Sequence, residues 1–325
     1  MKRLDEAEVI RIMSSALGIA DRDDVAVIDL PGTRQEQLAF KADMLVASTD
    51  VPAQMKPWQV ARKSLVACAS DLACKGVLPV AAMISLGLPA GISRGYVEGL
   101  AKGFQAASQE FGVKIVGGDT NEAGDLVIDC SMVGAVTKGW PVPRRSGARP
   151  GDAVVVSGMF GYPAAGLVML LGDRSIKTPS GQFRKAAVES VLEPRPRQEF
   201  GMALARYFSS SIDSSDGLAF SLYEIATQSS RVDIKVDYEK VRAAGVDEFA
   251  QANGLDPRSF VFFGGEEYEI IATIPKASMP EARAAAKKAG VALHEVGTVT
   301  KGAGRVYDGK SLLENRGYQH LARPR

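Results

Sequence analysis

The chain has 325 residues, of which 46% are hydrophobic and 24% charged, and its formal net charge is +1. The length favours two domains with a sizeable core, and the small charge gives no reason to expect nucleic acid or an acidic membrane as a partner. With only two histidines, a histidine-rich metal site and most histidine-based acid–base chemistry are excluded. Any metal is therefore expected to be a hard cation bound by oxygen ligands.

The N-terminus and the cysteines favour a cytoplasmic protein without a membrane anchor. The first residues carry acids where a signal peptide needs an apolar run. No apolar stretch approaches the roughly 18 residues needed to span a bilayer. The cysteines Cys68, Cys74 and Cys130 lack CxxC spacing and suit small buried hydrophobes in a reducing cytosol.

Hydrophobic periodicity predicts a first half in which helices and strands alternate. Helices are expected over residues 5–17, 57–75 and 93–111, and strands over residues 25–28, 38–48, 78–88 and 126–136. Pro31 and Gly32 predict a turn. Pro57 suits the first turn of its helix, and Gly76 is expected to end that helix as a C-cap.

The stretch from Val113 to Glu122 reads as a short apolar strand that runs into Gly117 and Gly118 and then reaches Asp119. Two consecutive glycines permit a sharp turn and the close approach of a bulky anion. An acid just after such a turn is well placed to hold a cation that holds phosphate. Taken alone, the stretch favours a plain turn.

Carboxylates occupy three further positions of interest in this half. Residues 21–24 include three aspartates, which read either as a solvated loop or as cation ligands. Asp43 lies inside a strand, where Asp is disfavoured, so it needs a partner. Asp71 shares a helical stripe with Val60 and Ser64, which should pack inward. Because an unpaired carboxylate there would cost several kcal/mol, Asp71 is expected to be either a structural cap or a cation ligand.

The second half begins after a segment rich in proline, glycine and arginine, residues 138–152. We expect the domain boundary there, with one domain over residues 1–137 and another over residues 138–325. Strands are predicted at 153–157 and 295–299, helices at 164–171, 218–227 and 279–290, and a loop with short helices at 172–197. Residues 211–217 read as a compact acidic turn, and Gly264-Gly265-Glu266 repeats the glycine–glycine–acid theme before a strand.

Six aspartates thus stand at strand or helix ends or beside glycine and serine: Asp24, Asp43, Asp71, Asp119, Asp213 and Asp216. Semi-buried carboxylates repel one another unless divalent ions bridge them. Mg²⁺ prefers carboxylates together with phosphate oxygens, so a polyphosphate is the expected companion. The chain has neither a P-loop nor a kinase-type glycine-rich signature. The pattern therefore predicts a nucleotide site built from aspartates and ions.

The order and spacing of these motifs resemble the thiamine-monophosphate kinase family, within the PurM-like superfamily of AIR synthetase-related proteins. The motifs are DDVAV (23–27), ADMLV (42–46), SDLACKG (70–76), GGDT (117–120), RSGARPGD (145–152), DSSDG (213–217) and GGEEYE (264–269). The resemblance implies an α/β (α+β) protein of two domains, in which the N-terminal sheet pairs across a homodimer and a larger α+β domain follows. It also implies transfer of the γ-phosphoryl group of ATP to thiamine monophosphate.

The resemblance carries functional roles to specific positions. It implies that several Mg²⁺ ions are held by Asp24, Asp43, Asp71, Asp119, Asp213 and Asp216. ATP would be contacted by Gly118, Asp119, Arg145 and Ser215, and catalysis would rest on Asp119, Asp216 and Arg145. The thiamine side would be formed by Asp50, Glu266 and Tyr318.

The chain departs from the family pattern at two places. Lys41-Ala42 stands where the family commonly has Ser-Thr, and Asp50 stands where it often has a substrate histidine. A carboxylate cannot copy a cationic contact to phosphate. Placing Thr49-Asp50 on the family's Thr-Asp is an alternative registration, but only Asp43 keeps the count to Ser70-Asp71 free of gaps.

The expected chemistry needs no general base, because the phosphate of the acceptor is already anionic near neutral pH. Transfer would be direct and in line, with charge neutralised by ions and Arg145. One alternative is a PurM-like enzyme with another acceptor, although the first cysteine is Cys68 and the tail carries none. The other is a nucleotide-binding regulator with weakened catalysis. Release of ADP with and without thiamine monophosphate separates these cases.

Overall fold

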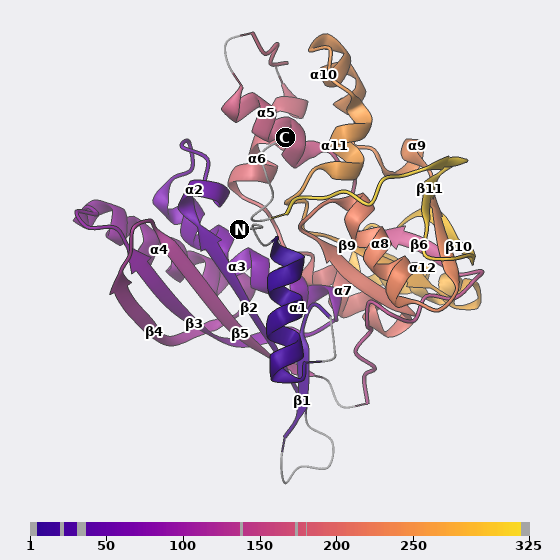
Figure 1. Ribbon diagram of the computed structural model, residues 1–325, viewed down its shortest axis with the longest axis horizontal. Coiled ribbons are helices and arrows are strands. Elements are labelled where there is room, and N and C mark those ends of the chain that lie inside the picture. The colour runs from indigo at the N-terminus through magenta and orange to yellow at the C-terminus, as the bar shows by residue number, and fades with distance from the viewer. Residues whose placement is uncertain are drawn as a thin grey trace.

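The computed structural model describes residues 5–19, 23–30, 37–136, 139–172, 175–179 and 181–319. Within these residues the chain forms a five-stranded sheet of order β1-β2-β5-β3-β4 and a seven-stranded sheet of order β12-β11-β8-β10-β6-β9-β7. The first sheet and its helices lie on one side of the molecule and the second sheet on the other (Figure 1). The expected turn at Pro31 and Gly32, the start of the acidic segment at residues 20–22 and the boundary at 137/138 fall outside the described residues.

The helices and strands predicted for the first half are present, except that residues 47 and 48, expected in a strand, begin a short helix that was not predicted. The strands are β1 (Ala26–Asp29), β2 (Gln37–Val46), β3 (Leu78–Leu88), β4 (Lys114–Glu122) and β5 (Val127–Val136), and the helices are α1 (Glu6–Leu17), α2 (Ala47–Asp50), α3 (Pro57–Cys74) and α4 (Arg94–Phe111). Helices α3 and α4 cover one face of the sheet. The pairing is antiparallel except between β3 and β4, which α4 connects as a parallel βαβ unit.

The sharp turn expected at Gly117 and Gly118 is wrong, because β4 continues through both residues to Glu122. Neither glycine has a positive φ angle. Gly118 is small for another reason: a Cβ atom there would lie 1.7 Å from the carbonyl oxygen of Ile84 on β3. The glycine permits the two parallel strands to approach each other, next to a shift of register between Ala82 and Met83.

The second half carries the larger sheet and most of the helices. Its strands are β6 (Ala153–Val156), β7 (Ser210–Ser214), β8 (Val232–Val236), β9 (Glu269–Ile274), β10 (His294–Lys301), β11 (Val306–Asp308) and β12 (Ser311–Leu312). Its helices are α5 (Tyr162–Leu171), α6 (Gln182–Leu192), α7 (Gln198–Leu204), α8 (Leu218–Gln228), α9 (Tyr238–Val241), α10 (Val246–Ala252), α11 (Pro257–Phe263) and α12 (Met279–Ala289). The acidic turn expected over 211–217 is shorter, because residues through Ser214 belong to β7.

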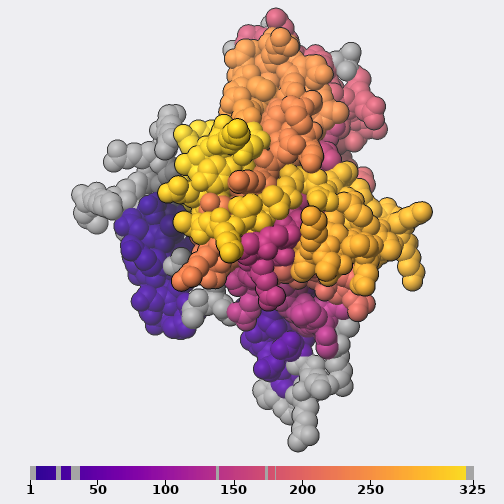
Figure 2. All heavy atoms as spheres, turned by 90° about the vertical axis from the view of Figure 1, so that its right-hand side faces the viewer, coloured from indigo at the N-terminus to yellow at the C-terminus, as the bar shows by residue number. Residues whose placement is uncertain are grey.

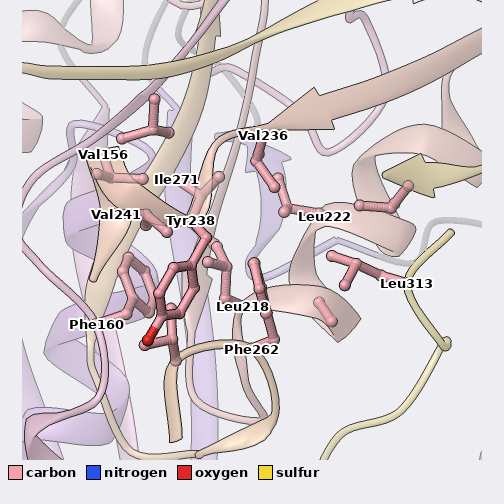
Figure 3. Packing of buried hydrophobic residues seen from close by; sticks show 14 of the residues in the cluster. Val156, Phe160, Leu218, Leu222, Val236, Tyr238, Val241, Phe262, Ile271 and Leu313 are labelled. Carbon is pink, nitrogen blue, oxygen red and sulfur yellow. The ribbon is translucent and has the colours of Figure 1, made fainter. Parts of the chain in front are cut away.

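The core of the second half lies between this sheet and the helices that pack on it. Figure 3 shows Val156 and Ile271 from the sheet facing Leu218, Leu222 and other apolar side chains. These side chains are almost completely removed from water. Burial on this scale anchors α8 against the sheet, and it thereby holds the Ser215–Gly217 turn that precedes α8.

Helix α3 joins the two halves. It packs on β2 and β5 of the first sheet and also touches α7, β7 and β9 of the second half. The contact with α7 is close, because a Cβ atom at Gly201 would lie 1.8 Å from the carbonyl oxygen of Ala73. Almost every α3 residue from Gln59 to Cys74 is buried. Polar side chains on α3 are therefore held at the junction between the sheets.

Helix α1 stands apart from these layers. It begins with a capping box at Asp5 and Glu8, and none of its residues is buried. Ile10 and Met13 are both about half exposed. In the space-filling view the indigo N-terminal residues lie at the rim of the molecule (Figure 2). Among the described residues, no helix combines the length and the apolar character needed to cross a membrane.

Candidate active site

Three predicted metal ligands from three separate segments meet at the junction of the two halves. Asp24 precedes β1, Asp71 lies on α3 and Asp213 lies on β7, and all three are buried. One carboxylate oxygen from each lies within 4.8 Å of the others. Mg²⁺ binds oxygen at about 2.0–2.1 Å, so two ligands of one ion lie about 4 Å apart or less. The donor set and spacing therefore fit a hard divalent cation after a small adjustment.

Asp24 is fixed by two cations. Arg145 donates from Nε to Asp24 Oδ1 at 2.8 Å and also contacts that oxygen through Nη2, while Lys75 Nζ lies 2.6 Å from Asp24 Oδ2. Burial opposes ionisation of Asp24, but the charges of Lys75 and Arg145 outweigh it and lower its pKa to about 2. Asp24 is consequently a carboxylate at neutral pH.

Lys75 is a buried residue that the sequence reasoning did not select. Its ammonium group also lies 2.6 Å from Asp23 Oδ1 and donates to the carbonyl oxygen of Ser211 at 2.8 Å. Lys75 is the C-cap of α3, one residue earlier than the Gly76 cap expected from the sequence, and Gly76 follows in the left-handed conformation with φ 66°. The lysine therefore ties the end of α3 to both the acidic segment and β7.

Asp71 and Asp43 share one lysine. Lys41 Nζ lies 2.7 Å from Asp71 Oδ2 and 3.3 Å from Asp43 Oδ1. Burial raises the pKa of Asp71 well above its ordinary value, and Lys41 opposes that rise. The partner that Asp43 requires inside its strand is thus Lys41, on the same face of β2 two residues earlier.

Asp213 has a neutral partner among the described contacts. Ser70, the α3 residue before Asp71, donates its hydroxyl to Asp213 Oδ2 at 2.8 Å. Burial and the neighbouring charge of Asp24 raise the pKa of Asp213 to about 6, against an ordinary value of 3.8. Ser70 and Asp71 together therefore bring α3 into contact with β7.

The turn after β7 gathers four more predicted site residues. The carbonyl oxygen of Ser215 accepts a hydrogen bond from the backbone N–H of Glu266 at 2.6 Å, and that of Asp216 accepts one from the N–H of Tyr318 at 2.9 Å. Glu266 and Tyr268 have φ angles of 64° and 51°, which residues with side chains rarely adopt. Such local strain is maintained where surrounding contacts determine the backbone.

Asp50 lies near these residues, and its side chain accepts a hydrogen bond from the backbone. Its carboxylate accepts the N–H of Val46 at 2.7 Å at the start of α2. Burial raises the pKa of Tyr318, and the charges of Asp50 and Glu266 add to that rise, so these groups are close enough to interact. The structure therefore brings Asp50, Glu266 and Tyr318 together.

Lys63 is the second cation that the sequence reasoning missed. It lies on α3 with 3% of its side chain exposed, forms an ion pair with Glu266 and donates to the carbonyl oxygen of Asp50 at 2.7 Å. A sequence signal existed, because Lys63 precedes Asp71 by eight residues, which places it about 80° from Asp71 around a helix of 3.6 residues per turn, at the edge of the same inward stripe. A positive charge thus stands beside the position where the chain lacks a histidine.

Asp119 and Gly118 lie away from the buried carboxylates. Asp119 is exposed on β4 and pairs with Ser85, which in turn pairs with Asp129 on the helix-free face of the first sheet. Asp43 lies three strands away, which at the usual strand spacing is roughly 14 Å. Among the described residues, the group with oxygens within 4.8 Å comprises Asp24, Asp71 and Asp213 without Asp119.

The chain is similar to known proteins over most of its length. The family model for "AIR synthase related protein, N-terminal domain" matches residues 22–136. The thiamine-monophosphate kinase of Nitrosopumilus maritimus is 39% identical over 324 residues, covering 99% of this chain and 100% of that protein. The enzyme of Pyrococcus horikoshii is 36% identical over 282 residues, covering 86% and 85%.

Solved structures give the same answer for the whole fold. The structure of AaThiL complexed with AMPPCP and TMP has a TM-score of 0.86 at 28% identity, covering 98% of this chain and 99% of that chain. Thiamine monophosphate kinase from Aquifex aeolicus, solved separately, has a TM-score of 0.81 at 27% identity and covers 96% and 99%. These matches confirm the α/β PurM-like fold, and the chain belongs to the thiamine-monophosphate kinase family.

Proposed function

We propose that this chain transfers the γ-phosphoryl group of ATP to thiamine monophosphate, giving thiamine diphosphate and ADP. A protein named thiamine-monophosphate kinase matches the chain over nearly its full length. The observation that carries the proposal is the meeting of Asp24, Asp71 and Asp213 beside the turn that holds Glu266 and Tyr318. A nucleotide–metal subsite and an acceptor subsite would then share one junction.

We propose that magnesium is held chiefly by Asp24, Asp71 and Asp213, with Asp43 and Asp216 at its edge. All are hard oxygen donors of the kind Mg²⁺ requires. When bound, the metal would neutralise the negative charge that develops on the transferring phosphoryl group. The chain contributes by positioning these carboxylates before the nucleotide arrives, through Lys75, Lys41 and Ser70.

The proposed contacts to ATP are Gly118, Asp119, Arg145 and Ser215. Arg145 is the best supported of these, because its guanidinium group lies against Asp24 and 21% of its side chain is exposed. Arg145 also pairs with Glu224 at 3.2 Å, which fixes the plane of the guanidinium group. A guanidinium group has five N–H donors, and those of Arg145 that do not contact Asp24 or Glu224 are available to phosphate oxygens.

On the acceptor side we propose that Glu266 and Tyr318 face the thiamine moiety. Lys63 supplies the positive charge that Asp50 cannot supply. It also fixes the positions of the Glu266 carboxylate and the Asp50 carbonyl group, because it contacts both. The acceptor phosphate is already ionised and attacks without a general base. Positioning and charge neutralisation would therefore carry the catalysis, with Asp216 holding the backbone of Tyr318 as well as acting as a metal ligand.

We further propose a homodimer built on the helix-free face of the first sheet. A hollow of about 430 Å³ on this face is lined by apolar side chains, among them Phe40, Met83, Val116 and Val133. Phe40 and Met83 are 42% and 53% exposed, which is unusual for a contiguous apolar surface on a monomer. Asp119 lies on the same face, so its proposed role in binding nucleotide and metal depends on a second copy.

Two further assignments, the domain boundary and the cellular location, accompany this proposal. We place one domain over residues 1–137 and the other over residues 138–325, since the first sheet ends at Val136 and the second begins at Ala153. We also propose a cytoplasmic location, because Cys68, Cys74 and Cys130 are all buried free thiols, which suits a reducing compartment.

The decisive experiment measures ADP release by the purified protein with ATP and Mg²⁺, with and without thiamine monophosphate. Release that depends on thiamine monophosphate is expected. Asp216→Ala should abolish it while the circular dichroism spectrum stays unchanged, and Glu189→Ala, an exposed acid on α6, should retain it. Nucleotide binding without turnover would instead favour a regulator, and full activity of Asp216→Ala would remove that residue from the site.

A further inference from the structure

One cation already lies among the buried carboxylates, and it belongs to the chain. Lys41 extends from β2 toward α3, where its ammonium group is 2.7 Å from Asp71 Oδ2 and 3.3 Å from Asp43 Oδ1. Asp213 is close enough to influence it electrostatically. The lysine therefore touches two of the proposed metal ligands and neighbours a third.

The surroundings keep this ammonium group charged and in place. The Asp71 side chain is 8% exposed and that of Lys41 is 22% exposed, so water screens the pair only weakly. A lysine is protonated near neutral pH, and two carboxylate oxygens lie within ion-pair distance of this ammonium group, Asp71 Oδ2 and Asp43 Oδ1. Removing one partner of such a pair would leave a poorly solvated charge behind.

A divalent ion and this ammonium group compete for the same oxygens. A Mg²⁺ ion bound to Asp71 Oδ2 would sit about 2.0–2.1 Å from that oxygen, next to a nitrogen only slightly farther away. Two cations bound to the same carboxylate oxygen repel each other, and water screens this repulsion only in part, since the Lys41 side chain is 22% exposed. Asp71 can therefore offer an ion its other oxygen, while the space between Asp71 Oδ2 and Asp43 Oδ1 is taken by Lys41.

We propose that Lys41 is a built-in cation of the site, which takes the place that one further divalent ion would otherwise fill between Asp43 and Asp71. This inference rests on the proposed magnesium site. It assigns Lys41 a positioning role: the ammonium group aligns Asp43 and Asp71 before metal arrives, and the protein binds one divalent ion fewer than its carboxylates could accommodate.

The experiment counts bound ions directly. Equilibrium dialysis of Mn²⁺ against the full chain saturated with a non-hydrolysable ATP analogue gives the number of ions per chain. Lys41→Ala, which removes the charge and opens the space, should bind one ion more than the wild type. Lys41→Arg, which keeps a cation there, should bind the wild-type number, as should Lys102→Ala, which removes an exposed lysine from α4.

A second measurement covers the stability of the variant. In EDTA, Lys41→Ala should melt at a lower temperature than the wild type, and Mn²⁺ should raise its melting temperature by more. If Lys41→Ala is unfolded without metal, recovery of the fold on adding Mn²⁺ supports the inference, and failure to recover overturns it.

The outcomes separate this inference from the proposal on which it rests. An equal Mn²⁺ count in the wild type and Lys41→Ala overturns the role of Lys41 and leaves the magnesium site intact. Absence of Mn²⁺ binding in the wild type overturns both. A higher count in Lys41→Arg as well would show that charge at residue 41 does not control the number of ions.

Discussion

At the scale of single residues, neighbouring carboxylates of the site differ in their affinity for protons because their partners differ. Burial disfavours the charged form of both Asp24 and Asp213. Lys75 and Arg145 reverse this effect for Asp24, whose pKa falls to about 2, whereas Asp213 has the Ser70 hydroxyl and a pKa of about 6. Of these two carboxylates, Asp213 therefore gains more when a cation binds.

This difference predicts how pH affects the metal-free protein. The pKa of Asp213 is about 6 in the folded state against an ordinary value of 3.8, so the folded state holds this proton more tightly. Its contribution to stability is complete below about pH 4 and is lost as the pH rises through 6, an effect on the order of 3 kcal/mol. Urea unfolding in EDTA should show a larger loss from pH 5 to pH 7 in the wild type than in Asp213→Asn. Equal losses would contradict this account.

At the scale of elements, α3 organises the site because it is buried against both sheets. One helix contributes Lys63 to the acceptor side, Ser70 and Asp71 to the metal cluster, and Lys75 to the acidic segment before β1. A helix that is packed against both sheets keeps several of its side chains in a fixed relative geometry.

The tie between α3 and the segment at Glu266 can be tested by a double-mutant cycle. Lys63→Met should destabilise the protein by about 2 kcal/mol, less than a fully buried pair would give, because Glu266 is 26% exposed. It should also raise the KM for thiamine monophosphate at least about tenfold, with the KM for ATP little changed. Adding Glu266→Gln removes the unpaired carboxylate, so it should restore much of the stability without restoring that KM. Recovery of both quantities would show that neither Lys63 nor Glu266 contacts the acceptor.

At the scale of the whole molecule, the helix-free face of the first sheet is unusual because it exposes several large apolar side chains. Helices cover the other face, yet Met44, Val80, Met83 and Val116 are each more than half exposed. Asp119 lies on this same face, far from the buried carboxylates. A second copy seated here would both cover the apolar side chains and bring Asp119 into an interface.

Assembly through this face predicts the effect of a charge placed in it. Met83→Asp should raise the dimer dissociation constant by a factor of about 100 or more, roughly 3 kcal/mol, because a carboxylate would be buried without a partner. Sedimentation velocity should then show a monomer where the wild type is a dimer. Leu171→Asp, at an exposed apolar residue on α5, provides the control and should leave the dimer intact. A wild-type monomer at micromolar concentration would exclude this interface.

The amino-acid sequence by itself determined most elements and the identity of the acidic residues. Helical and strand periodicities are local properties, so α3, α4, β2 and β3 followed from spacing alone. The inward stripe on α3 likewise indicated that Asp71 needs a partner. Family motifs then supplied the class of reaction, which the comparisons support.

Only the tertiary structure decided which charges meet. The continuation of β4 through Gly117 and Gly118 depends on pairing with β3, and the ion pairs of Lys41, Lys63 and Lys75 join residues from separate elements. Such contacts depend on how sheets and helices pack, since a local pattern shows that a buried carboxylate needs a cation but not which one. The sequence therefore identified the acids of the site, and the fold identified the cations that hold them.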